Sequence, residues 1–221
     1  MTAAIVFTIL ATIVGALFIV AWRRRERERY ISAYVFPPGI RERVRKRYPH
    51  LDDEQLDLVF DALREYLHLC RKAGRRMLAM PSQVVDVAWH EFILFTRNYQ
   101  HFCRRGLGRF LHHTPAEAMK SPTEAGDGIK RTWALACRRA GLDPAKAGAL
   151  PLLFAIDGQL AIADGFRYAL DCTHVLAAAQ GAAVYCGTHI GCGGGCGGGC
   201  SGSGCSGDGG GDGGCSGGGG D

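Results

Sequence analysis

The hydrophobic pattern begins with an unbroken apolar run from Ala3 to Trp22, which holds no charged residue. At about 1.5 Å per helical residue, such a run spans roughly 30 Å, which matches the hydrocarbon core of a bilayer. No basic residue precedes it, and Trp22-Arg23 stands where a signal peptide would carry small residues and a cleavage site. The run therefore predicts an uncleaved single transmembrane helix over residues 1–22.

Helical periodicity follows the apolar run. Pro37-Pro38-Gly39 interrupts the chain before a short basic helix expected over 40–48, which we interpret as a collar outside the core. A helix capped by Asp52 or Asp53 then carries apolar residues at three- and four-residue spacing and ends near Gly74. This is the clearest amphipathic helix of the chain.

The next predicted helix starts with Ser82 as its cap and runs for about 23 residues to Gly106. Apolar residues occur around most of its circumference, so we expect it to be buried on most sides. Four polar residues fall within about 60 degrees of one another on it: Asp86, His90, Arg97 and His101.

The rest of the chain adds shorter elements. A helix begins at Pro122 and ends near Gly141, and three apolar pieces over 150–156, 160–162 and 166–170 form either a hairpin or short packed helices. The Ala-rich run over 175–184 predicts one more helix. The fold class is therefore mainly α, with four parts: a transmembrane anchor over 1–22, a basic juxtamembrane segment over 23–50, an α-rich globular domain over 51–186 and a disordered Gly/Cys-rich tail over 187–221.

The tail is expected to be disordered because of its composition. Residues 187–221 contain 20 Gly and 5 Cys, and after Ile190 no other apolar side chain could offset the entropy of ordering glycine. In a reducing cytosol these thiols would serve metal or redox roles, whereas an inverted topology would make them disulfide partners.

Positive charge is concentrated beside the apolar run. Residues 23–47 hold ten Lys or Arg against three Glu. The local net charge of +7 exceeds the net charge of +5 for the whole chain. Such residues stay on the cytoplasmic side, so we expect the N-terminus outside and the domain and tail in the cytoplasm of a bacterial inner membrane. Anionic lipid head groups are the expected partners of Arg23–Arg47, and no nucleic acid is expected because the charge stops close to the membrane.

Four of the eight histidines lie between Asp86 and Pro115. His90-Glu91 resembles the start of a zinc-protease helix, but that motif needs histidine at position 94, which is leucine. A looser zinc or iron site remains open, with four candidate ligands: Asp86, His90, His112 and His113. The alternatives are a structural polar network around Asp86 and acid–base chemistry by His90 with Asp86.

A second group of metal ligands is Cys186, His189 and Cys192, whose spacing is short enough to bind one soft metal ion. Cys172 and His174 could add further ligands, although their gap differs from that of common zinc ribbons.

The run W-H-E-F-I-L-F-T-R at Trp89, the G-R-F-L-H-H-T-P at Gly108 and the Gly/Cys tail resemble bacterial proteins known only as glycine-rich domain-containing. Trp89-His90 followed by Tyr99 is more distantly similar to plant glycine-rich domain proteins. The resemblance implies a recurring architecture and assigns no reaction.

These patterns indicate a single-pass membrane-anchored protein that acts as a binding or assembly module, with its protein partner unidentified. The alternative is a metal-dependent enzyme or metal-binding protein centred on Asp86, His90, His112 and His113. The predicted core, residues 51–186, lacks the Gly-rich phosphate loop and the nucleophile elbow of several enzyme classes.

Overall fold

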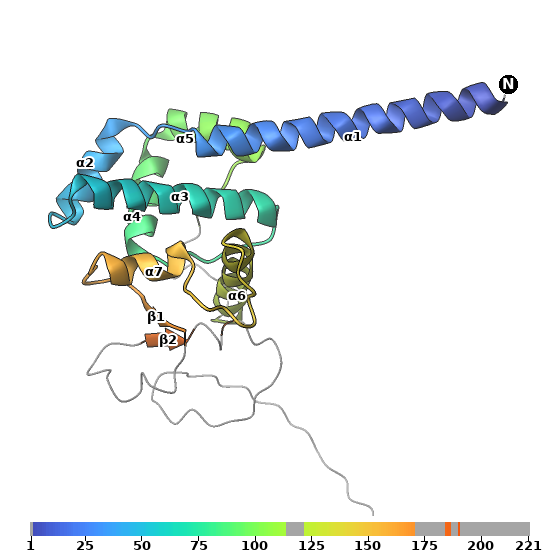
Figure 1. Ribbon diagram of the computed structural model, residues 1–221. Coiled ribbons are helices and arrows are strands. Elements are labelled where there is room, and N and C mark those ends of the chain that lie inside the picture. The colour runs from blue at the N-terminus through green and yellow to red at the C-terminus, as the bar shows by residue number, and fades with distance from the viewer. Residues whose placement is uncertain (1, 114–121, 171–183, 187–189, 191–221) are drawn as a thin grey trace, which may run out of the picture.

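The computed structural model describes residues 2–113, 122–170, 184–186 and 190, and it is mainly helical, as predicted (Figure 1). The elements are α1 (Thr2–Ser32), α2 (Pro38–Arg47), α3 (Asp53–Ala73), α4 (Gln83–Leu94), α5 (Thr96–Phe102), the π-helix η1 (Cys103–Leu107), α6 (Pro122–Arg139), α7 (Leu152–Gln159), β1 (Arg167–Ala169) and β2 (Val184–Cys186).

Helix α1 extends well beyond the rest of the molecule (Figure 1). It is long and apolar enough to cross a membrane, and its apolar window is fully exposed. The helix does not end with the apolar run, because it continues through the basic residues to Ser32. Its last turns pack into the body, where Ile31 is fully buried and the ring of Tyr30 lies 5.9 Å from that of Phe102.

Helix α3 is central and contacts α1, α2, α4, α6, α7 and η1. Its start is a capping box in which the Asp52 carboxylate accepts from the Gln55 N–H and the Gln55 side chain accepts from the Asp52 N–H. Its C-terminal cap is Gly74, whose φ of 65° suits glycine. Both predicted ends of this helix are confirmed.

Helix α2 belongs to the core, and the interpretation of residues 40–48 as an external collar is wrong. Ile40 and Val44 are fully buried and Tyr48 is nearly so. Sequence reasoning missed this apolar face because charged residues outnumber the apolar ones in α2. The helix lies at the end of α3 opposite to the direction in which α1 projects (Figure 1).

The single helix predicted from Ser82 to Gly106 is interrupted, which corrects the sequence interpretation. At Phe95 the backbone turns out of the helical region, with φ −80° and ψ 61°, and the chain resumes as α5 and then η1. The Phe95 ring lies where a Cβ on residue 39 would crowd it, and it lies beneath the guanidinium of Arg43, 5.5 Å from its Cζ. The break between α4 and α5 therefore coincides with packing of Phe95 on α2. No glycine or proline near Phe95 marks the break in the sequence.

The helix predicted from Pro122 is confirmed as α6, and its Trp133, Ala136 and Cys137 are buried. Of the ambiguous apolar pieces, the first is helical (α7) and the last forms strand β1. Strand β1 pairs in parallel with β2, so these pieces do not form a hairpin. The helix predicted over 175–184 falls outside the described residues except for Val184, which lies in β2. The disordered tail predicted over 187–221 also lies outside them, except for Ile190.

Candidate metal centre

The candidate site lies on α4, whose first turn is fixed by a buried carboxylate. Ser82 is the N-cap, and its hydroxyl accepts from the Val85 N–H while it donates to Asp157 Oδ1 at 2.7 Å. Asp157 also accepts the N–H groups of Gln83 at 2.7 Å and Val84 at 3.3 Å. An anion with these partners satisfies the free donors of the helix start and interacts favourably with the helix dipole.

Asp157 also binds the chain that follows α7, because it accepts the Phe166 N–H at 2.8 Å. The residue is only 2% exposed, and Gly165 lies so close that a Cβ there would meet the Asp157 side chain. Sequence reasoning missed this role, since Asp157 falls between two of the apolar pieces, 150–156 and 160–162, and was assigned to neither. Its sole sequence signal is an acidic residue inside an apolar segment.

Asp86 and His90 lie one turn apart on α4, as the helical spacing predicts. His90 Nδ1 lies 2.9 Å from the Asp86 carbonyl oxygen and 3.2 Å from Asp86 Oδ2. An imidazole that donates one ring nitrogen to a backbone carbonyl keeps its other nitrogen available for a metal ion.

His113 reaches this pair from a different segment. Gly108, with a φ of 73°, ends η1, and the Arg27 guanidinium occupies the space that a Cβ would fill there. The returning chain is attached where the Tyr99 hydroxyl donates to the Leu111 carbonyl, and Tyr99 accepts the indole N–H of Trp89 at 3.3 Å. The His113 ring then packs on Trp89, with 4.7 Å between the ring centroids.

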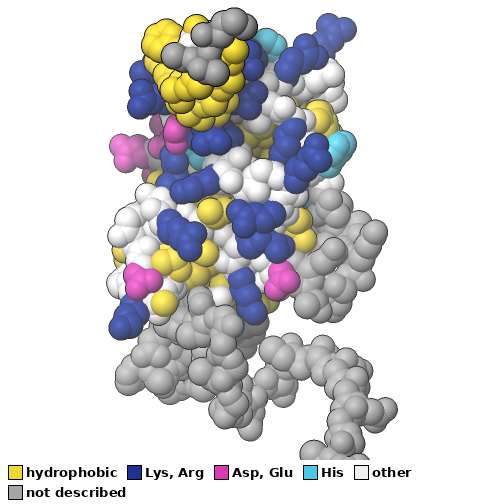
Figure 2. Space-filling model, turned by 90° about the vertical axis from the view of Figure 1, so that its right-hand side faces the viewer, with side chains coloured by type: hydrophobic (Ala, Val, Ile, Leu, Met, Phe, Trp, Pro, Cys, Tyr) yellow, Lys and Arg dark blue, Asp and Glu magenta, His cyan; other side chains and the backbone are white. Residues whose placement is uncertain are grey.

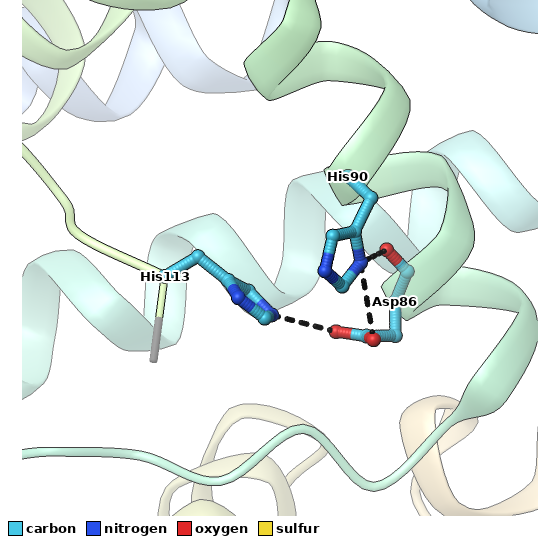
Figure 3. A group of neighbouring side chains, drawn as sticks. All are labelled: Asp86, His90 and His113. Atoms are coloured by element: carbon cyan, nitrogen blue, oxygen red, sulfur yellow. Dashed lines mark hydrogen bonds and ion pairs between the residues drawn. The ribbon is translucent and has the colours of Figure 1, made fainter. Parts of the chain in front are cut away.

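The three side chains converge on one point, with both imidazoles turned toward the Asp86 carboxylate (Figure 3). His113 Nε2 lies 3.3 Å from Asp86 Oδ1, and the ring centroids of His90 and His113 are 4.0 Å apart. Potential ligand atoms of all three lie within 4.8 Å of one another. The side chain of His90 is 48% exposed, whereas that of His113 is 15% exposed, so the cluster is reachable from solvent on the His90 side.

This donor set fits zinc or iron. Two imidazoles and one carboxylate on one side of an ion, with the other positions open, are typical of catalytic zinc and non-haem Fe(II) sites. Ligands at about 2.1 Å from one tetrahedral ion lie about 3.4 Å apart, so ligand atoms that are now up to 4.8 Å apart would have to approach by up to about 1.4 Å. Rotation of the exposed His90 ring can supply such a shift. The same distances also suit hydrogen bonds in a polar network centred on Asp86.

The other predicted site residues do not join the cluster. His112 is exposed and its ring packs on Phe110, 4.8 Å between centroids, because adjacent side chains leave a non-helical backbone in different directions. Arg97 and His101 are exposed on α5, so the break at Phe95 removes them from the predicted polar stripe.

In the second predicted group, Cys186 lies in β2, while His189 and Cys192 fall outside the described residues, as do Cys172 and His174. Three cysteines of the folded body are free and buried: Cys70, Cys103 and Cys137. Burial raises the pKa of Cys70 to about 12 and that of Cys137 to about 11. These two thiols are therefore neutral near pH 7, and they serve as apolar packing rather than as metal ligands.

The fold and the cluster together define a mainly helical domain that carries a long apolar N-terminal helix and an Asp-His-His group. The chain belongs to the UCP032817-like family, whose family model matches residues 26–190. No curated protein and no solved structure matches the chain. The matched residues start in the basic part of α1 and include the whole cluster.

Proposed function

We propose that this protein is a single-pass membrane protein of the bacterial inner membrane, and that its helical domain is a binding or assembly module on the cytoplasmic side. The observation that carries this proposal is α1, which is exposed along its apolar part and packed into the core at its other end. A core helix of a soluble protein would bury its apolar part. The unbroken helix instead links the domain directly to the segment that would enter the membrane.

The charge on the molecule supports this orientation. Figure 2 views the body from the side toward which α1 projects, and this face shows more Lys and Arg than Asp and Glu. Basic residues favour the cytoplasmic side and attract anionic head groups.

The arginines of α2 contribute little to this surface. Arg41 pairs with Asp57, Arg43 with Glu91 and Arg47 with Asp164, all within the domain. Lipid contact, predicted for Arg23–Arg47, is therefore proposed mainly for the basic part of α1.

Anchoring is tested by fractionation and intact mass. We expect the full-length chain to remain in the membrane fraction and to retain residues 1–22. Leu10→Arg with Leu17→Arg should release it, because each arginine costs about 2.5–3.5 kcal/mol at a membrane centre. Leu94→Arg is the matched control, since Leu94 is also an exposed leucine, 62% accessible, but lies on the body. A mature chain that lacks residues 1–22 would instead identify a cleaved signal sequence.

Orientation is tested in intact cells with a membrane-impermeant maleimide. We expect the tail cysteines to be labelled only after the membrane is permeabilised, because the proposed topology places them in the cytoplasm. Labelling of the tail without permeabilisation would contradict the cytoplasmic location of the tail.

A second function, metal binding, is favoured by the convergence of Asp86, His90 and His113 within 4.8 Å. The ligands would be Asp86 and His90 from α4 and His113 from the segment after η1. An ion held there could bind a substrate group or activate water at its open positions.

Elemental analysis of the full-length protein in detergent micelles tests this second function. We expect about one zinc or iron per chain, lost in Asp86→Ala and His113→Ala, because removing a ligand lowers metal affinity steeply. His112→Ala is the matched control, since it removes the neighbouring imidazole outside the cluster. Metal that is lost only when the chain is truncated after Tyr185 would move the site to Cys186, His189 and Cys192. No metal in the wild-type protein would leave Asp86 as the centre of a structural network.

A further inference from the structure

A second site lies between α1, α3 and α6, where α1 leaves the body. A cavity of about 650 Å³ is present there, within the roughly 300–1,000 Å³ typical of small-ligand pockets. Its charged wall residues are four cations and one carboxylate: Arg24, Arg71, Lys72, Arg139 and Glu28. A cavity with this excess of positive charge attracts anions.

Glu28 shows how the wall holds an oxyanion. Its Oε1 lies 3.3 Å from a guanidinium nitrogen of Arg71 and 3.9 Å from one of Arg139, so one carboxylate oxygen is shared by two arginines from different helices. Among the described residues, Arg24 and Lys72 have no carboxylate within ion-pair distance. The wall therefore carries more positive charge than Glu28 neutralises.

Two buried nitrogens in the same wall have no hydrogen-bond partner in the described part of the chain: His68 Nδ1 and Arg71 Nε. His68 is only 3% exposed, and its Nε2 lies 3.0 Å from the Ser32 hydroxyl. Arg71 Nε can only donate, and buried donors in proteins are normally paired. The unpaired donor of Arg71, within a cationic wall, points to an occupant rich in acceptor oxygens.

The charge of this wall comes from its arginines and lysine rather than from His68. Burial, aided by the nearby Arg139, lowers the pKa of His68 to about 4. The imidazole is thus neutral near pH 7 and can donate a hydrogen bond without adding charge.

The cavity is placed at the level of lipid head groups. Arg24 follows Trp22 by two residues, about 3 Å along the helix, and Trp22 ends the apolar run. Arginine pairs well with phosphate because its guanidinium offers parallel donors. We propose that this cavity binds the phosphate group of an anionic phospholipid, an inference that rests on the membrane anchoring proposed above.

Native mass spectrometry of the full-length chain in micelles, with phosphatidylglycerol or phosphatidylcholine added, tests this site. We expect preferential binding of phosphatidylglycerol, weakened at least about tenfold by Arg71→Gln combined with Arg139→Gln, since two charge-assisted contacts are lost. Glu28→Gln should strengthen binding, because it removes the carboxylate that competes for both arginines. This gain does not depend on whether the double variant folds well.

Arg104→Gln is the matched control, because Arg104 is exposed on η1, which also contacts α1, but lies outside the cavity. Equal weakening in Arg104→Gln, or no gain in Glu28→Gln, would reduce the effect to general surface charge and overturn the proposal. Glycerol 3-phosphate provides the soluble arm. If it binds with the same variant pattern while phosphatidylglycerol does not, the ligand is a free phosphate ester and the lipid assignment is wrong. If glycerol 3-phosphate binds with this variant pattern and the chain fractionates as a soluble protein, the proposed membrane anchoring is wrong. The phosphate-binding site would then still be supported.

Discussion

Asp157→Ala is expected to lower the stability of the domain by about 3–5 kcal/mol, which is the usual cost of breaking a buried, hydrogen-bonded charge network. The substitution would leave the Ser82 hydroxyl and the N–H groups of Gln83, Val84 and Phe166 without their shared acceptor. Each buried donor left unpaired costs about 1–3 kcal/mol. For a domain of this size, a melting point roughly 10 °C lower should be measurable by circular dichroism of the full-length chain in micelles.

Asp61→Ala is the control for this change. Its side chain is 63% exposed and pairs with Arg64 within α3, a surface interaction worth less than about 1 kcal/mol. Asp157→Asn should fall between the two, because it retains one acceptor oxygen. Hydrogen exchange should also rise first at the start of α4. Equal melting points for Asp157→Ala and Asp61→Ala would show that the carboxylate does not hold these segments together.

Phe102→Ala should cost about 3–5 kcal/mol, the range for removing a fully buried aromatic ring. Phe102 is 0% exposed, and its ring lies 5.9 Å from Tyr30, 4.7 Å from Tyr34 and 5.4 Å from Phe92, measured between centroids. These rings join α1 and the segment after it to α4 and α5. The loss should therefore loosen the attachment of α1 as well as lower the melting point.

Trypsin cleavage near Arg27 and Arg29 measures that attachment, and we expect it to be faster in Phe102→Ala than in the wild-type protein. Phe110→Ala is the matched control, because Phe110 is 46% exposed and loss of its ring should cost less than about 1 kcal/mol. If both variants protect these arginines as well as the wild type does, the aromatic cluster is not what fixes α1 to the body.

The sequence predicted the elements whose signals are local. The cap at Asp52, the glycine end at Gly74 and the cap at Ser82 all depend on neighbouring residues, and each is confirmed. The break at Phe95 was missed because it coincides with packing against Gly39 and Arg43 on α2, more than fifty residues away in sequence. The same limit hid the burial of α2, whose two apolar side chains are outnumbered by charged ones.

The candidate metal centre was predicted in part for a similar reason. Asp86 and His90 share one helix, so their spacing alone brought them together. Choosing between His112 and His113 required the path of the returning chain, which is set by the contact of Tyr99 with Leu111 and by packing on Trp89. Asp157 and the cavity around His68 depend on long-range contacts, and no local pattern could reveal them.

In the proposed membrane-anchored protein, the continuity of α1 from its apolar part into the folded body fixes the angle by which the domain is rotated relative to the bilayer. Each residue of a helix adds about 1.5 Å of height and about 100° of rotation. One residue added beside Trp22 would thus turn the whole domain by more than a quarter of a circle about the axis of α1. With α1 anchored as proposed, the number of residues between Trp22 and the first core contacts would therefore determine which side of the domain faces a neighbour in the same membrane.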